Sequence, residues 1–187
     1  DNTTTYTYKN NRLETMKDAS GRTVTFVYNA DGTVKEVQAP GSRKLLYSYE
    51  NGKLVSYTDF DGAVTKYEYA ADGKLLAVYE PTHTDAKPVV NRFLYNGDML
   101  KEAINPRNES FKLAYDLTKR TLLFTQPNNR KLSYTYNAAG NPIQYVEDVD
   151  SLKLTTNYKY VGNNLTETTD PNDIGSGKPT ESFQYDK

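Results

Sequence analysis

The 187-residue chain contains no cysteine and no tryptophan, one histidine, two methionines and no long apolar run. Without cysteine, neither a disulfide nor a thiolate metal site can stabilise the fold. No apolar stretch approaches the roughly 20 residues that a membrane-spanning helix needs, so we expect no membrane span. Long runs with a 3.6-residue apolar period are missing too, and their absence argues against a helical fold.

The chain also lacks an excess of either charge sign. The 23 basic and 24 acidic residues are scattered along the chain and leave a net charge of −1. A nucleic-acid-binding protein normally has a basic face, so we expect no nucleic-acid partner. Hydrophobic residues make up 36%, which is low for a packed globule, yet there are 17 tyrosines. Tyrosine suits a pleated, half-buried surface, so the composition favours a thin sheet over a thick core.

The tyrosines recur at a regular spacing of 20 to 26 residues. The residue two positions before each recurring tyrosine is aromatic in eight of nine cases. Self-similarity at such a period indicates a repeat array, in which we assign these aromatic residues a structural role. The recurring tyrosines are Tyr8, Tyr28, Tyr49, Tyr69, Tyr95, Tyr115, Tyr136, Tyr160 and Tyr185.

Each repeat reads as a β-hairpin. In Tyr67-Glu68-Tyr69-Ala70-Ala71-Asp72-Gly73-Lys74-Leu75, two tyrosines share one strand face and Asp-Gly tolerates the positive φ of a tight turn. We expect equivalent tyrosines of neighbouring repeats to stack. In the second strand of each pair, apolar residues such as Leu54 and Tyr57 lie three apart. This offset predicts a bulge or a face switch near the outer turn, the turn that leads from one repeat to the next. Hairpin turns are predicted at Asp31-Gly32, Asn51-Gly52, Asp72-Gly73 and Ala139-Gly140.

The repeats predict an all-β fold: an array of antiparallel β-hairpins of about 20 residues each, with around sixteen strands in all. So wide a sheet must twist, and we expect a curled, spiral sheet or part of a hollow shell. We interpret residues 1–187 as a single segment of about eight repeats, truncated at both ends. Polar insertions are expected at residues 82–88 and 170–179.

The signature Tyr-x-Tyr, Asx-x-x-Gly and Leu resembles the YD repeat of bacterial Rhs and wall-associated polymorphic toxin proteins, Tc toxin components and teneurins. Tyr136-Asn137-Ala138-Ala139-Gly140-Asn141 is among the best copies, and the resemblance covers essentially the whole chain. It implies a structural scaffold, either shell or stalk, in a large secreted or cell-surface bacterial protein. Its partners would be neighbouring repeats of the parent chain and an enclosed C-terminal effector domain.

No residue pattern indicates catalysis, a cofactor or a metal, so we predict a chain that is not an enzyme and binds no cofactor. The single histidine, His83, lies in an insertion without an orienting scaffold. Three aspartate groups, at residues 59–62, 148–150 and 170–173, lack the ligand spacing of a calcium loop. Aromatic repeats leave one alternative open, a carbohydrate- or cell-wall-binding module with cell-wall glycan as its partner.

Overall fold

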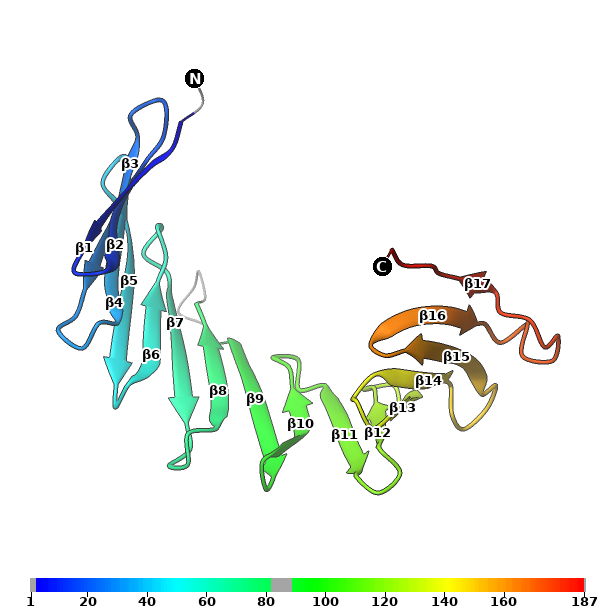
Figure 1. The fold of residues 1–187 in the computed structure, drawn as a ribbon. Helices are drawn as coiled ribbons and strands as arrows, with labels where there is room; N and C mark the ends of the chain where they lie inside the picture. Colours follow the sequence, from blue (N-terminus) through cyan, green and yellow to red (C-terminus); the bar gives the residue numbers. More distant parts are fainter. Residues whose placement is uncertain (1–2, 82–88, 187) are drawn as a thin grey trace. The chain divides into compact units, whose positions relative to one another are not determined.

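The computed structural model describes residues 3–81 and 89–186. Every helix or strand among these residues is a β-strand, and every recorded strand pair is antiparallel between neighbours in the sequence (Figure 1). The predicted all-β array of β-hairpins is therefore confirmed. The chain divides into two units, residues 1–92 and 93–187, which are described separately below.

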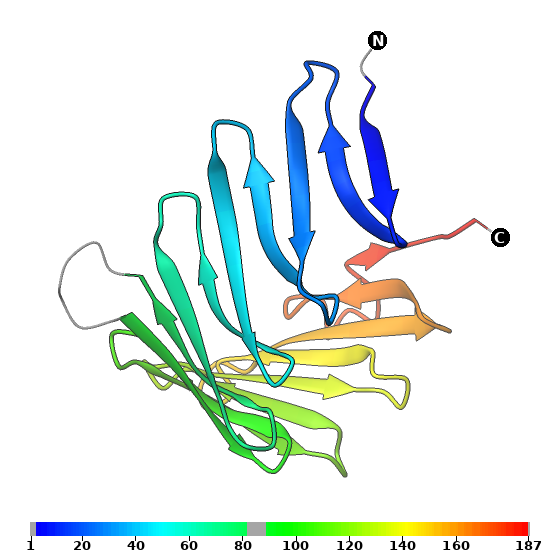
Figure 2. The ribbon, with the colours of Figure 1, turned by 90° about the vertical axis from the view of Figure 1, so that its left-hand side faces the viewer.

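The first unit holds four hairpins and the start of β9. Its strands run side by side with turns at alternating ends (Figure 2). They are β1 (Thr5–Lys9), β2 (Arg12–Lys17), β3 (Thr23–Tyr28), β4 (Val34–Ala39), β5 (Arg43–Glu50), β6 (Lys53–Thr58), β7 (Val64–Tyr69), β8 (Leu75–Glu80) and β9 (Val89–Asn96).

The second unit continues the same pattern from the end of β9. Its strands are β10 (Met99–Ile104), β11 (Ser110–Asp116), β12 (Thr121–Thr125), β13 (Lys131–Tyr136), β14 (Pro142–Glu147), β15 (Leu154–Val161), β16 (Asn164–Thr169) and β17 (Glu181–Ser182). Residues 170–179, expected as an insertion, form a series of turns before β17. The other expected insertion, residues 82–88, lies outside the described residues.

One five-residue turn recurs seven times in the described part of the chain. Its first residue donates its N–H to the carbonyl of the fifth and accepts the N–H of the fourth. The fourth residue always has positive φ and is glycine in five cases and asparagine in two, as this backbone region demands. The turns begin at Asp18, Asn29, Asp59, Ala70, Asn105, Gln126 and Asn137.

An aspartate or asparagine at the first turn position adds side-chain bonds. Asp59 Oδ1 accepts the N–H groups of Asp61 and Ala63, each at 2.9 Å. Asn137 Oδ1 does the same for the residues two and four positions later. The Asx-x-x-Gly spacing of the sequence is therefore turn chemistry, in which Asx binds the loop and Gly supplies the positive φ.

Two other hairpin turns, those of β1–β2 and β5–β6, have two central residues with positive φ. Asn51 and Gly52 have φ values of +51° and +74°, and Asn10 and Asn11 have +50° and +60°. Positive φ at both central positions is the type I′ geometry that matches the twist of a hairpin. All four hairpin turns predicted from the sequence are confirmed.

A β-bulge follows the hairpin turn in six hairpins. In β5–β6, Tyr47 lies opposite Tyr57 but Tyr49 lies opposite Leu54, so the second strand carries one extra residue, Val55. The extra residue brings Leu54 and Tyr57, three apart, onto the same face. The prediction of a bulge was right, but its place was wrong: it lies beside the hairpin turn, not the outer turn.

The sheet has almost no buried core. Ala77, with 4% of its surface exposed, is the single buried residue among those described. Most strand residues are half-buried, as expected for a thin sheet whose side chains cover each other laterally. Within residues 3–81 and 89–186, no helix is long and apolar enough to cross a membrane.

Candidate functional site

The two faces of the first unit's sheet differ in chemistry. Along β7, Tyr67 and Tyr69 are half-buried on one face, while Val64, Lys66 and Glu68 are exposed on the other. This alternation follows from the two-residue period of a strand. The repeat tyrosines thus mark one face, here called the tyrosine face, and the opposite face, here called the charged face, carries Lys66 and Glu68 on β7.

The nine repeat tyrosines are not equally covered. Tyr8, Tyr115 and Tyr185 are exposed by 67%, 40% and 54%. The remaining six are half-buried: Tyr28, Tyr49, Tyr69, Tyr95, Tyr136 and Tyr160. Tyr185 follows β17 and lies outside any strand, although the sequence spacing placed it among the strand tyrosines of the repeats.

Ring contacts lie within hairpins. Tyr47 and Tyr57 have ring centroids 5.4 Å apart, and Tyr134 and Tyr145 have centroids 5.0 Å apart. Both pairs are directly opposed on the two strands of one hairpin. Among the described residues, no recorded ring pair joins equivalent tyrosines of neighbouring repeats. The expected stack of repeat tyrosines is therefore wrong. The repeat tyrosines of these two hairpins, Tyr49 and Tyr136, lie opposite Leu54 and Pro142, and it is the aromatic residue two positions earlier that meets a cross-strand ring.

The tyrosine beside the bulge instead connects one hairpin to the preceding one. Tyr28 donates its hydroxyl to the carbonyl of Leu13 at 2.8 Å, and Tyr69 donates to the carbonyl of Leu54 at 3.0 Å. The β2–β3 and β6–β7 ladders each comprise three residue pairs and do not reach these carbonyls. The phenol therefore supplies the donor that the backbone ladder lacks at this end.

A cationic side chain also lies over the ring of each of these two tyrosines. Arg12 lies over the Tyr28 ring at 5.6 Å, and the ammonium of Lys53 lies over the Tyr69 ring at 5.5 Å. Such contacts attract a cation to the ring face. Sequence analysis missed both cations, although each directly precedes the leucine whose carbonyl accepts the phenol. That shared Arg/Lys-Leu pair was the available signal.

The same cations act on the next hairpin turn. The pKa of the Asp31 carboxyl is lowered mainly by the Thr33 N–H and hydroxyl that it accepts, and also by the charge of Arg12. The pKa of Asp72 is lowered by the Lys74 ammonium and N–H, with a contribution from Lys53. Turn, ring and cation thus form one local cluster at each of these two junctions.

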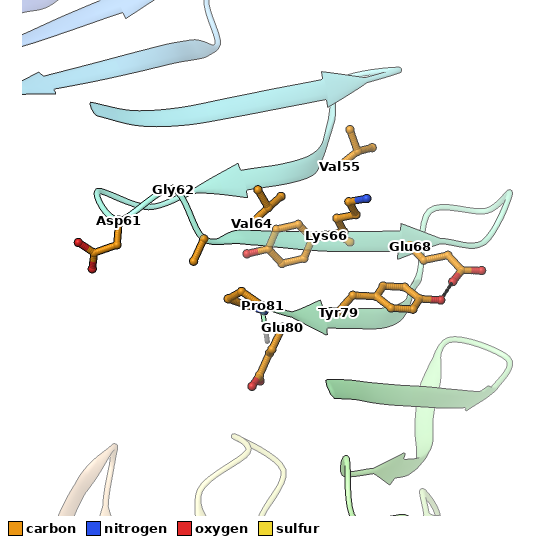
Figure 3. Close-up of a pocket in the computed structure, with 11 residues that line it drawn as sticks. Val55, Asp61, Gly62, Val64, Lys66, Glu68, Tyr79, Glu80 and Pro81 are labelled. Carbon is orange, nitrogen blue, oxygen red and sulfur yellow. Dashed lines mark hydrogen bonds between the residues drawn. The ribbon is translucent and has the colours of Figure 1, made fainter. Parts of the chain in front are cut away.

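The charged face carries an open groove of about 880 Å³ on β6, β7 and β8 (Figure 3). Val64, Tyr79 and Pro81 provide apolar surface, and Lys66 and Glu68 provide charge. Tyr79 donates its hydroxyl to Glu68 at 2.5 Å, and this bond, together with burial, raises the Tyr79 pKa. The groove can therefore offer a ring, an ammonium and carboxylates to a polar ligand.

The other candidate residues of the sequence belong to turns or fall outside the described residues. Asp59 accepts backbone N–H groups, Asp148 accepts the N–H of Leu152 at 3.3 Å, and Asp173 accepts the Thr180 hydroxyl at 2.6 Å. No group of three or more His, Cys, Asp or Glu residues in the described part of the chain is arranged so that it could hold a metal ion. His83 lies outside that part.

Comparison with curated proteins shows close relatives over part of the chain, whereas no family model matches. Over 112 residues, or 60% of its length, the chain is 54% identical to the tRNA nuclease WapA of Bacillus subtilis strain 168. It matches the tRNA(Glu)-specific nuclease WapA of Bacillus subtilis subsp. natto equally well. The match spans 5% of the length of each relative.

These relatives correct one prediction. The sequence indicated a chain that is not an enzyme, but the matched relatives are named as nucleases that act on tRNA. The sequence of this chain could not reveal the link to tRNA nucleases, because its residue patterns reflect the turns and strands of the repeats. The prediction of a non-enzyme is therefore wrong for the proteins to which this chain is related.

Solved structures show the same fold. A crystal structure of TcdB2–TccC3–TEV superposes with a TM-score of 0.64 at 17% identity, covering 89% of this chain and 10% of that one. A Photorhabdus luminescens Tc holotoxin pore gives 0.63 at 15% identity, covering 94% and 10%. Together with the WapA relatives, these matches confirm the resemblance on which the sequence analysis relied, and the chain shares its fold with these toxin structures.

Proposed function

We propose that this chain is a scaffold segment, part of the repeat shell or stalk of a large secreted bacterial cell-surface or toxin protein. The observation that carries the proposal is the backbone ladder: in the first unit every strand from β2 to β8 pairs with both of its sequence neighbours. A sheet held by its backbone can be extended hairpin by hairpin, as a scaffold requires. The repeat tyrosines support it by covering one face and bridging hairpins.

The scaffold proposal extends to the parent protein. The relatives are far longer than the matched stretch, which supports the interpretation of residues 1–187 as one segment of about eight repeats with more repeats beside it. We propose that such repeats curl into a spiral that encloses a C-terminal effector domain. The parent protein would then cleave tRNA, as the names of the WapA proteins state for them.

A deletion in register tests the scaffold. Removing residues 29–69 from the parent protein joins Tyr28 to Ala70, so the five-residue turn that begins at Ala70 follows a tyrosine as before. A scaffold should fold, resist protease and be exported after this loss of two hairpins. Removing residues 29–64 joins Tyr28 to Thr65 without a turn and should abolish folding. If the in-register variant folds but loses tRNA cleavage, the segment carries a site of its own and the proposal fails.

Location is tested separately. The chain has no cysteine and is rich in tyrosine, asparagine and threonine, a composition compatible with export from a bacterium. We expect the parent protein in the culture medium or the cell-wall fraction, detected by an antibody against this segment. Recovery from the cytoplasm alone would contradict the proposed location.

The groove on the charged face favours a second candidate function, the binding of cell-wall glycan. The Tyr79 ring offers a stacking surface, and Lys66 and Glu68 offer polar contacts to hydroxyl and amino groups. A glycan array should then show binding that Lys66→Ala and Tyr79→Ala abolish and that Lys112→Ala, on another strand, leaves intact. No binding to any wall polymer would leave the scaffold as the sole function.

A further inference from the structure

Two tyrosine pairs occupy the same place in two hairpins. Tyr47 lies directly opposite Tyr57, and Tyr134 lies directly opposite Tyr145. Their ring centroids are 5.4 and 5.0 Å apart, with interplanar angles of 43° and 34°. All four rings are half-buried, so each pair is held in place and still reachable from solvent.

Other hairpins with a recorded register do not repeat this pairing. At the positions equivalent to Tyr47 and Tyr134, Tyr6 lies opposite Met16, Tyr67 lies opposite Val78 and Tyr158 lies opposite Thr168. The second unit also has an aromatic pair without hydroxyls, Phe111 and Phe124, whose centroids are 6.0 Å apart. The two tyrosine pairs are therefore distinct from the other repeats in chemistry as well as in geometry.

We propose that Tyr47–Tyr57 and Tyr134–Tyr145 are sites of oxidative cross-linking, with hydrogen peroxide as oxidant and a haem peroxidase as catalyst. Each phenol loses one electron and its hydroxyl proton to become a tyrosyl radical. The two radicals join through the ring carbons next to the hydroxyls, and the hydrogens on those carbons leave as protons while the phenols re-form. Per pair, two hydrogens are lost and one peroxide becomes two waters.

The composition makes tyrosine the principal target for such oxidation. The chain lacks cysteine and tryptophan and has two methionines, against 17 tyrosines. A carbon–carbon bond between β5 and β6, or between β13 and β14, would join the strands of a hairpin covalently. It would give this cysteine-free chain the kind of staple that other exported proteins obtain from disulfides.

Trypsin makes the first pair directly testable, because Lys53 lies between the two tyrosines. The folded chain is treated at low concentration with peroxide and peroxidase, digested and analysed by mass spectrometry. We expect peptides 45–53 and 54–66 linked, with the loss of two hydrogens. This product should exceed links between any other two tryptic peptides by at least about tenfold, because held neighbours have a high effective concentration.

Matched variants identify the tyrosines. Tyr57→Phe should abolish the link, whereas Tyr49→Phe, which removes the other tyrosine of peptide 45–53, should retain it. For the second pair, peptide 132–153 should lose two hydrogens, and Tyr145→Phe should prevent that loss. Circular dichroism of each variant verifies that the sheet remains.

Unfolding provides the last control. In concentrated urea the preference for the two pairs should vanish, since it depends on the hairpin register. Links distributed equally over all tyrosines in the folded chain, or an unchanged pattern after unfolding, would overturn the proposal. So would persistence of the 45–53 to 54–66 link in the Tyr57→Phe variant.

Discussion

The hydroxyl of Tyr69 donates a 3.0 Å hydrogen bond to the carbonyl oxygen of Leu54, in the preceding hairpin. Tyr28 and Leu13 repeat this bond at 2.8 Å one pair of hairpins earlier. In both cases the accepting carbonyl lies beyond the last paired residue of the ladder between the hairpins. The bond therefore holds hairpin to hairpin where the backbone does not.

Removing this hydroxyl should weaken the first unit. We expect Tyr69→Phe to lower the free energy of unfolding by about 1 kcal/mol, the net value of one hydrogen bond. Tyr67→Phe is the control, because Tyr67 lies on the same face of the same strand and its hydroxyl has no hydrogen bond to any residue of ranges 3–81 and 89–186. Urea unfolding measures both. Equal midpoints for the two variants would show that the phenol–carbonyl bond contributes nothing.

Gly73 should tolerate no side chain. Its φ is +95°, and a Cβ there would lie 2.8 Å from the Lys53 ammonium nitrogen. Lys53 is flexible enough to move, so the backbone dominates, and Gly73→Ala should cost about 1–2 kcal/mol. Gly175→Ala is the matched control, since no atom lies within 4 Å and its φ is not in the left-handed region. A comparable loss in both variants would contradict this reasoning.

Asp59, which begins a turn, should contribute more to the stability of the fold than Asp61, which lies within the same turn. Asp59 accepts two backbone N–H groups, so Asp59→Ala should destabilise the chain by about 1 kcal/mol, as for loss of a capping side chain. Asp59→Asn keeps an acceptor and should restore most of the stability. Asp61→Ala, in the same turn, should have little effect in thermal or urea unfolding. An Asp61→Ala loss as large as that of Asp59→Ala would argue against the turn account.

Acid should destabilise the folded chain through its turn aspartates. The pKa values of Asp18, Asp31 and Asp72 lie below the ordinary 3.8, because hydrogen bonds to their carboxylates favour the charged form. A lowered folded-state pKa contributes stability that is present above about pH 4 and is lost as the pH falls through the folded value. Urea midpoints measured from pH 7 to pH 2.5 should fall accordingly. In the Asp18→Asn, Asp31→Asn, Asp72→Asn triple variant this fall should be smaller.

Alkali should also destabilise the folded chain, through its half-buried tyrosines, whose pKa values are raised where those of the turn aspartates are lowered. Burial raises the pKa values of Tyr47, Tyr136 and Tyr158 above the ordinary 10.0. A raised folded-state pKa means that stability is present below pH 10 and is lost as the pH rises through the folded value. Phenolate absorbance should therefore titrate later in the folded chain than in urea. Identical titration curves would contradict the half-buried placement of these rings.

Much of the fold could be predicted from local chemistry in the sequence. The Tyr-x-Tyr alternation defined the first strand of each hairpin, and Asx-x-x-Gly defined the turn, because positive φ and side-chain turn bonds depend on neighbouring residues. The apolar offset of Leu54 and Tyr57 even indicated a bulge. The position of that bulge could not be predicted, since it depends on which residues lie opposite on the paired strand.

In the candidate site, too, some features could be predicted from the sequence and others depend on how the strands pair. The sequence by itself determined the repeat, the strands, the four predicted hairpin turns and the shared face of the two aromatic residues in Tyr-x-Tyr, because all of these follow from residues close together in the chain. Only the tertiary structure decided that Tyr69 reaches Leu54, that Lys53 lies over its ring, and that Tyr47 meets Tyr57 instead of an equivalent tyrosine of the next repeat. Those contacts depend on strand register and on where each ladder ends, and both are set by the pairing of whole strands.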